Sequence, residues 1–177
     1  MRSTLPIEDF PLPVVEKHRL RERVYDRTGL PEVQFHWWHQ PTLLPVRLHG
    51  RLEIIPWGCH TRRSPLPYGA LGEHPGPATS RPRCHTRRSP LPYGGWVPLE
   101  HVESGLLAGA KPEAVVIPAA FGHHRGMWFL IARGIRGIVI GSRSGPVVYM
   151  LTAPSTNYFR TMTEQSPTMP VLVDQVI

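Results

Sequence analysis

The sequence has few cysteines, few lysines and no long apolar run. Only two of the 177 residues are cysteines, Cys59 and Cys84, so a secreted disulfide framework is not expected and reduced thiols are the default. No apolar stretch approaches the roughly 20 residues that span a bilayer, and the first residues lack the apolar core of a signal peptide. We therefore expect a cytoplasmic protein that does not enter a membrane.

Recognisable catalytic and cofactor motifs are also missing. The chain has no glycine-rich nucleotide-binding loop and no Gly-x-Ser-x-Gly elbow, and neither cysteine lies in a recognisable catalytic setting. Two Cys-His pairs, at 59–60 and 84–85, supply thiols and imidazoles, but adjacent residues of an extended chain point to opposite sides. The sequence therefore predicts no metal site and no cofactor, and it leaves open whether the protein is an enzyme.

Proline and glycine are abundant and disfavour a helical bundle. The 21 prolines and 16 glycines make up about a fifth of the chain, a composition that favours short strands and turns. The expected fold is α+β, a single domain over residues 1–177 built around mostly antiparallel β-strands. A few short helices and a long loop rich in proline and arginine complete this expectation.

Apolar periodicity places the expected elements along the chain. A helix is expected over residues 11–28, a second over 96–107, and a third capped by Ser155 or Thr156. Alternating or dense apolar runs predict strands at residues 33–37, 44–48, 52–57, 114–118, 127–132, 135–140, 146–152 and 170–173. A tight turn is expected at 49–50 and a hairpin loop at 141–145.

One segment of the sequence occurs twice. Residues 59–69 recur unchanged at 84–94, with a period of 25 residues. A local tandem duplication explains this better than a solenoid, which needs at least three units. Because residues 59–83 contain four arginines and one glutamate, removing them would leave 152 residues and lower the net charge from +7 to +4. The stretch between the copies is rich in proline and glycine, so we expect an exposed, mobile loop from about 60 to 92.

The positive charge is carried almost entirely by arginine. The chain has 20 basic against 13 acidic residues, and only two of the basic residues are lysines. The guanidinium of arginine donates paired hydrogen bonds to phosphates and stacks on bases. Basic grooves lined with aromatic side chains bind single strands. We therefore expect single-stranded DNA as the partner. The candidate nucleic-acid-binding residues are Trp37, Trp38, Arg47, Trp57, Arg87 and Arg88. Tryptophans buried in the core and arginines that are merely solvated are the alternative.

Two adjacent histidines, His123 and His124, are the candidates for catalysis. Imidazole gains and loses a proton near neutral pH, which suits proton transfer. We expect the pair in a turn at residues 121–125. No spaced pair of carboxylates accompanies them, so packed or surface histidines are the alternative interpretation.

Three stretches of the second half share order and spacing with the motifs of one family. Residues 52–57 are similar to a strand that ends in Ile-Pro-x-Trp, and 115–122 to an Ile-Pro-Ala segment followed by a strand. Residues 147–157 resemble a strand and turn that enter a helix before a Met-Pro-Val segment, here at 169–171. Together they resemble the SOS-response-associated peptidase (SRAP) family, whose members sense abasic sites in single-stranded DNA and trap them covalently. The resemblance implies a shared fold with a DNA-facing cleft.

The resemblance also implies that the crosslinking chemistry is missing. The family's reactive cysteine follows the initiator methionine, where this chain has Arg2. The family's catalytic glutamate falls near His124, and its histidine falls on Ser166. We therefore expect an SRAP-like domain without the three reactive groups that binds single-stranded nucleic acid. The alternatives are a non-enzymatic interaction protein that uses the arginine-rich loop, and a different enzyme that uses His123 or His124.

Overall fold

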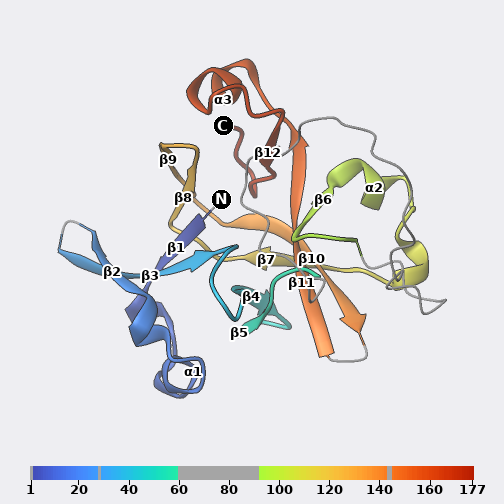
Figure 1. The fold of residues 1–177 in the computed structure, drawn as a ribbon. Helices are drawn as coiled ribbons and strands as arrows, with labels where there is room; N and C mark the ends of the chain where they lie inside the picture. Colours follow the sequence, from blue (N-terminus) through green and yellow to red (C-terminus); the bar gives the residue numbers. More distant parts are fainter. Residues whose placement is uncertain (1, 28, 60–91, 143–144) are drawn as a thin grey trace, which may run out of the picture.

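The described chain folds around two mostly antiparallel sheets (Figure 1). The structure is a computed structural model and describes residues 2–27, 29–59, 92–142 and 145–177. The first sheet has the strand order β2-β3-β1-β8-β9, and the second has the order β12-β11-β10-β7-β4-β5, with β6 parallel to β11. The fold is therefore α+β and dominated by antiparallel strands, which confirms the predicted class.

The strands are short, and the helices are shorter still. The first sheet consists of β1 (Arg2–Pro6), β2 (Val24–Arg27), β3 (Leu30–His36), β8 (Phe121–His124) and β9 (Met127–Leu130). The second consists of β4 (Leu43–Leu48), β5 (Arg51–Pro56), β6 (Trp96–Pro98), β7 (Glu113–Ile117), β10 (Ile135–Ser142), β11 (Gly145–Pro154) and β12 (Thr168–Pro170). The α-helices are α1 (Leu12–Lys17), α2 (Leu99–Glu103) and α3 (Asn157–Met162), and the 3-10 turns are η1 (Ile7–Asp9), η2 (Leu20–Arg23) and η3 (Ala108–Ala110).

The two sheets share one apolar core. Every second residue of a strand points to the same face, and this alternation buries Val33 and Phe35 of β3 together with Ile117 of β7 and Val148 of β11. A second, smaller cluster lies beneath α2 on the other face of the second sheet and includes Tyr149. The first sheet therefore has one apolar face, which joins the core, and one polar face.

The predicted helix over residues 11–28 is wrong beyond its first turns. Helix α1 ends at Lys17, and Arg19 adopts a left-handed conformation with φ of 51°. Residues 24–27 then form β2, in which Val24 pairs with Val33 of β3. A β-branched side chain is accommodated well in a sheet, so pairing with β3 overrides the helical periodicity read from this stretch.

Several local predictions are confirmed. His49 and Gly50 both have positive φ, at 49° and 77°, and connect β4 to β5 by the tight turn expected there. Thr156 caps α3 by accepting a hydrogen bond from the backbone N–H of Phe159 at 3.1 Å. β10 and β11 form the expected hairpin, and Ser142 pairs with Gly145 at its closed end.

The duplicated segment is anchored at its two ends. The N–H of Cys59 donates to the carbonyl of Gly94 at 2.9 Å, and the N–H of Gly94 donates to the carbonyl of Cys59 at 3.2 Å. The predicted mobile loop at 60–92 lies almost entirely outside the described residues. Among those that are described, no helix is long and apolar enough to cross a membrane.

Candidate nucleic-acid interface

Four side chains form a row across the polar face of the first sheet. Arg2 of β1 pairs with His36 of β3 on one side and with His123 of β8 on the other, and His123 pairs with Trp128 of β9. Paired residues of antiparallel strands point to the same face. Because neighbouring strands lie about 4.8 Å apart, the row spans about 14 Å from β3 to β9. Figure 1 shows β1 between β3 and β8, close to the N-terminus.

Arg2 is held in the middle of this row. Its Nε donates a hydrogen bond to Nδ1 of His123 at 3.2 Å, and its guanidinium carbon lies 5.6 Å from the centre of the Trp128 ring. The rings of His123 and Trp128 are 4.7 Å apart. A cation over an indole face is an attractive arrangement, and it leaves 37% of Trp128 exposed. The row thus combines a fixed positive charge with an accessible aromatic ring.

A second exposed tryptophan lies at the other end of the row. The ring of His36 lies 4.8 Å from the ring of Trp38 and 4.3 Å from the ring of His39. Trp38 is 57% exposed. We call Trp38, His36, Arg2, His123 and Trp128 the aromatic strip.

The histidines of the aromatic strip are uncharged near pH 7. Burial, followed by the nearby charges of His39 and Arg2, lowers the pKa of His36 to about 3. Burial and Arg2 also lower the pKa of His123 below its usual value. His36 donates from Nε2 to Gln34 at 3.0 Å, and His123 accepts from Arg2. The positive charge of the strip therefore resides on Arg2.

The polar face of this sheet is unusual in its chemistry. Thr4, Glu32 and His36 are buried on it, and each has a buried polar atom without a hydrogen-bond partner among the described residues. Buried polar groups are normally paired, and each exception costs about 1–3 kcal/mol. Packing alone does not favour such a face.

Of the three predicted tryptophans, the structure places only Trp38 in the aromatic strip. Trp57 is 0% exposed, donates from its indole N–H to the carbonyl of Gly95 at 2.8 Å, and packs against Trp37 and Trp96 at centroid distances of 5.1 and 5.2 Å. A base cannot stack on Trp57, which corrects its predicted role. Trp37 is half-buried in the same cluster.

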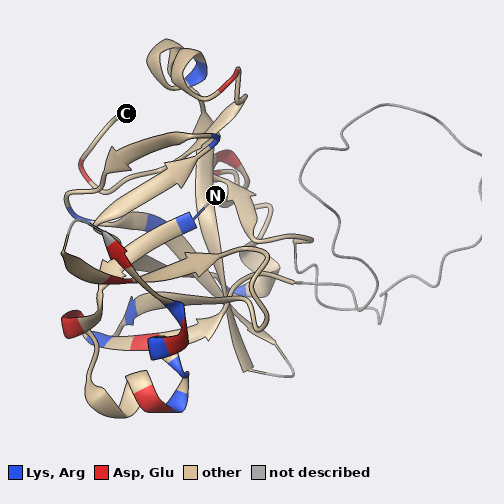
Figure 2. Cartoon of the chain, turned by 60° about the vertical axis from the view of Figure 1, so that its left-hand side comes forward, with Lys and Arg blue, Asp and Glu red and all other residues tan. Residues whose placement is uncertain are grey.

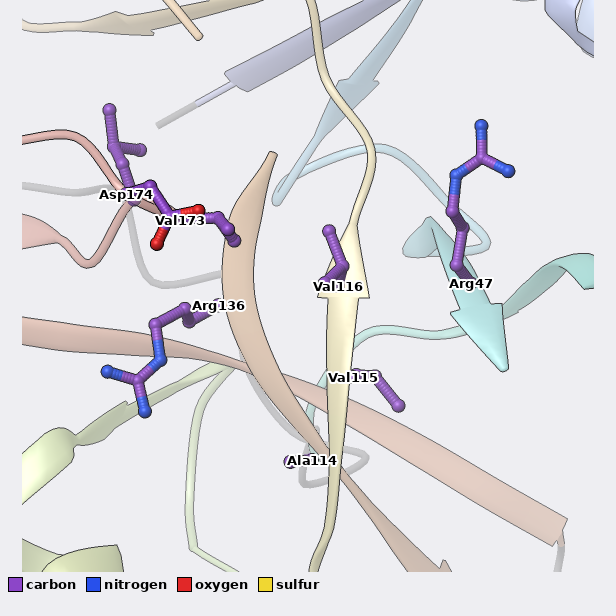
Figure 3. A pocket seen from close by; sticks show the side chains of 8 residues that line it. Arg47, Ala114, Val115, Val116, Arg136, Val173 and Asp174 are labelled. Carbon is purple, nitrogen blue, oxygen red and sulfur yellow. The ribbon is translucent and has the colours of Figure 1, made fainter. Parts of the chain in front are cut away.

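Arg47 lies in the other sheet. It is exposed on β4, in register with Val116 of β7, which is in turn in register with Arg136 of β10. Figure 3 shows the two arginines on opposite sides of Val116, around a shallow pocket of about 450 Å³. Their side chains extend away from each other in this view. Arg87 and Arg88 lie outside the described residues.

His123 and His124 lie on opposite faces of β8, not in the predicted turn. This stretch forms a strand because it pairs with both β1 and β9. His124 faces the core, where its Nε2 lies 3.0 Å from Oγ of Ser166 and its ring stacks on Phe159. The hydroxyl of Ser166 donates to the carbonyl of Thr168 at 3.0 Å.

The His124–Ser166 pair has the hydrogen-bond arrangement of a structural contact. Because the single hydroxyl proton of Ser166 goes to Thr168, the imidazole of His124 is the donor in the contact between them. Burial, reinforced by nearby positive charges, lowers the pKa of His124 to about 4, which makes it a weak base at pH 7. The contact ties β8 to the turn before β12.

Arg2, His36 and Trp128 were not predicted from the sequence as site residues. One local signal was available, since Glu32, Gln34 and His36 are polar at every second position of β3. The row itself depends on the pairing of four strands, which no short motif encodes.

The described residues contain no group of three or more His, Cys, Asp or Glu arranged to hold a metal ion. Comparison with protein-family models, with curated proteins and with solved structures finds no match for the chain.

Proposed function

We propose that this protein binds single-stranded nucleic acid along the aromatic strip. The observation that carries the proposal is the row from His36 through Arg2 and His123 to Trp128. With Trp38 packed beside His36, it sets a fixed cation between two exposed tryptophans. Non-specific single-strand binding uses these two components, a positive charge for the phosphates and aromatic faces for the bases.

The dimensions of the strip fit a short stretch of nucleic acid. A sheet that presents aromatic side chains on neighbouring strands stacks two or three bases. The row from His36 to Trp128 covers about 14 Å of sheet, and Trp38 lies beside His36 at one end of it. Since the histidines are uncharged, they do not repel Arg2, and the half-buried His123 adds ring surface beside Trp128.

The resemblance to the abasic-site sensors supports the same proposal. His124 and Ser166 match the family's catalytic glutamate and histidine, and they are in hydrogen-bond contact at 3.0 Å. Arg2 matches the reactive cysteine and lies in β1, which pairs with the strand of His124. A guanidinium is not a nucleophile under physiological conditions, so we propose non-covalent binding by an SRAP-like domain.

Fluorescence anisotropy with a labelled single-stranded oligonucleotide tests this proposal. Replacing Trp128 by alanine removes one stacking surface, which is worth about 1–3 kcal/mol, so the affinity should fall about 5- to 150-fold. Tyr93→Ala is the matched control, because Tyr93 is exposed and lies just before β6 in the other sheet. Its affinity should remain that of the wild type.

Two results would contradict the proposal. The first is no salt-sensitive binding of the wild-type protein at low salt, since neutralised phosphates make binding fall with salt. The second is a covalent adduct on a denaturing gel with an oligonucleotide that carries an abasic site, which would exclude the non-covalent mode.

A further inference from the structure

A basic groove lies beside the aromatic strip. Its lining includes Lys17, His18, Arg19, Glu22, Arg23 and His39, and its volume is about 550 Å³. The groove is formed by the end of α1, by η2 and by the connection from β3 to β4. His39 links the groove to the strip, because its ring lies 4.3 Å from that of His36.

The charges that line the groove are unbalanced. Lys17, Arg19 and Arg23 face it, against the single carboxylate of Glu22. The helical segment at the bottom of Figure 2, which contains α1, carries basic and acidic residues side by side. Most of the charged side chains that line the groove are basic, so the groove favours an anion.

Arg23 lines the groove and its guanidinium is held in place. Its Nη2 donates to the carbonyl of Pro41 at 2.7 Å, which fixes the guanidinium. Its Nη1 is buried and has no hydrogen-bond partner among the described residues. Burial lowers the pKa of Arg23 and the Glu22 carboxylate raises it only in part, so a counter-anion would further stabilise the charged guanidinium.

The two histidines of the groove respond to the same excess of positive charge. The pKa of His39 is lowered by burial and then by Arg23 and Arg2. The pKa of His18 is lowered by burial and then by Lys17 and Arg23. An anion bound between them would oppose the contribution of these cations and raise both values.

We propose that this groove binds a phosphate group and forms the phosphate subsite for a strand whose base stacks on Trp38. The second half of this inference rests on the proposed function. Guanidinium groups match phosphate oxygens in charge and geometry, and Arg19 and Arg23 supply two of them beside the ammonium of Lys17. Trp38 is next to His39 in the chain, which places the groove one residue from an exposed ring.

Titration of the histidine side chains by NMR with inorganic phosphate tests the groove directly, with chloride at equal ionic strength as the reference. Phosphate should shift the signals of His18 and His39 and raise their pKa values, and the shifts should be lost in Arg23→Gln. Arg19→Gln is the second variant, because Arg19 is exposed and its loss does not threaten folding. Arg51→Gln, which removes an exposed charge on β5, is the matched control and should titrate like the wild type.

Oligonucleotide binding over a salt series then separates the inference from the proposed function. Loss of one phosphate contact should reduce the slope of log affinity against log salt by about 0.7 in Arg19→Gln. Suppose that oligonucleotide binding needs Trp128, that the salt slope of Arg19→Gln is unchanged, and that phosphate shifts the NMR signals of neither histidine. The inference then fails and the proposed function stands. If phosphate shifts the NMR signals of both histidines but no oligonucleotide binds, the groove remains a phosphate site and the proposed function fails.

Discussion

Trp57 and Trp128 have opposite environments, and substituting each should affect a different property. Trp57 is completely buried and hydrogen-bonded to Gly95, whereas Trp128 keeps 37% of its surface exposed. Trp57→Ala should lower the free energy of unfolding by about 3–5 kcal/mol, because it opens a cavity among packed rings. Urea unfolding followed by circular dichroism measures this change, and Trp128→Ala in the same assay should stay close to the wild type. Equal losses for the two variants would contradict the assignment of Trp128 to binding.

The buried histidines should make the fold sensitive to acid. His36 and His124 have pKa values of about 3 and about 4 in the folded chain, against 6.5 when unfolded. Between pH 6.5 and about 4 the unfolded state therefore binds protons that the folded state does not, so stability falls as the pH falls. The effect is of the order of 1.4 kcal/mol per pKa unit for each group. Urea unfolding at several pH values measures it.

The variants His36→Gln and His124→Gln test the source of this acid sensitivity. Each removes one titrating group and should flatten the decline of stability between pH 6.5 and 4. His101→Gln is the matched control, since His101 lies at the surface on α2. A decline that is as steep in both variants as in the wild type would show that other groups cause it.

At the scale of elements, the segment leading into β6 depends on close approach to the tryptophan cluster. A Cβ atom built on Gly95 would lie 2.3 Å from the ring of Trp37 and 2.5 Å from the indole nitrogen of Trp57. Gly95→Ala should therefore cost about 1–3 kcal/mol in urea unfolding, as overpacking usually does. Gly109→Ala is the control, because nothing lies within 4 Å of its added Cβ. Unchanged stability of Gly95→Ala would mean that this segment shifts freely.

The elements that sequence periodicity predicted well are those that pair with near neighbours in the chain. The β4–β5 and β10–β11 hairpins have dense apolar runs and recognisable turn residues, so local pattern is enough. β1 and β8 are short and polar on one face, and they become strands because they pair with each other across more than a hundred residues. The candidate site shares this limit, since only Trp38 of the aromatic strip was predicted as a nucleic-acid contact.

At the scale of the whole molecule, the duplication should be dispensable for folding. The pair that closes the segment, Cys59 with Gly94, joins the first residue of one copy to the last residue of the other. Deleting residues 59–83 puts Cys84 in the place of Cys59 and keeps Gly94. Thermal unfolding of the deletion variant should show a fold as stable as the wild type or about 1 kcal/mol more stable, because a shorter loop costs less entropy to close.

The same deletion variant separates two ways of contacting a partner. If the aromatic strip carries binding, the variant should retain its affinity for the oligonucleotide at moderate salt, with a small loss from the lower net charge. If the arginine-rich loop is the contact element, binding should disappear while the fold persists. Failure of the variant to fold would contradict the anchoring of the segment at Cys59 and Gly94.

The central position of β1 has a consequence for how the protein is made. β1 is synthesised before both of its partners and can pair with β3 early, but its other edge waits for β8, which follows the end of β3 by about 85 residues. At the usual 5–20 residues per second, this edge stays open on the ribosome for about 4–17 s. An unpaired strand edge is a template for pairing with other chains. The strand that brings Arg2 to the aromatic strip is thus also exposed to aggregation until β8 has been made.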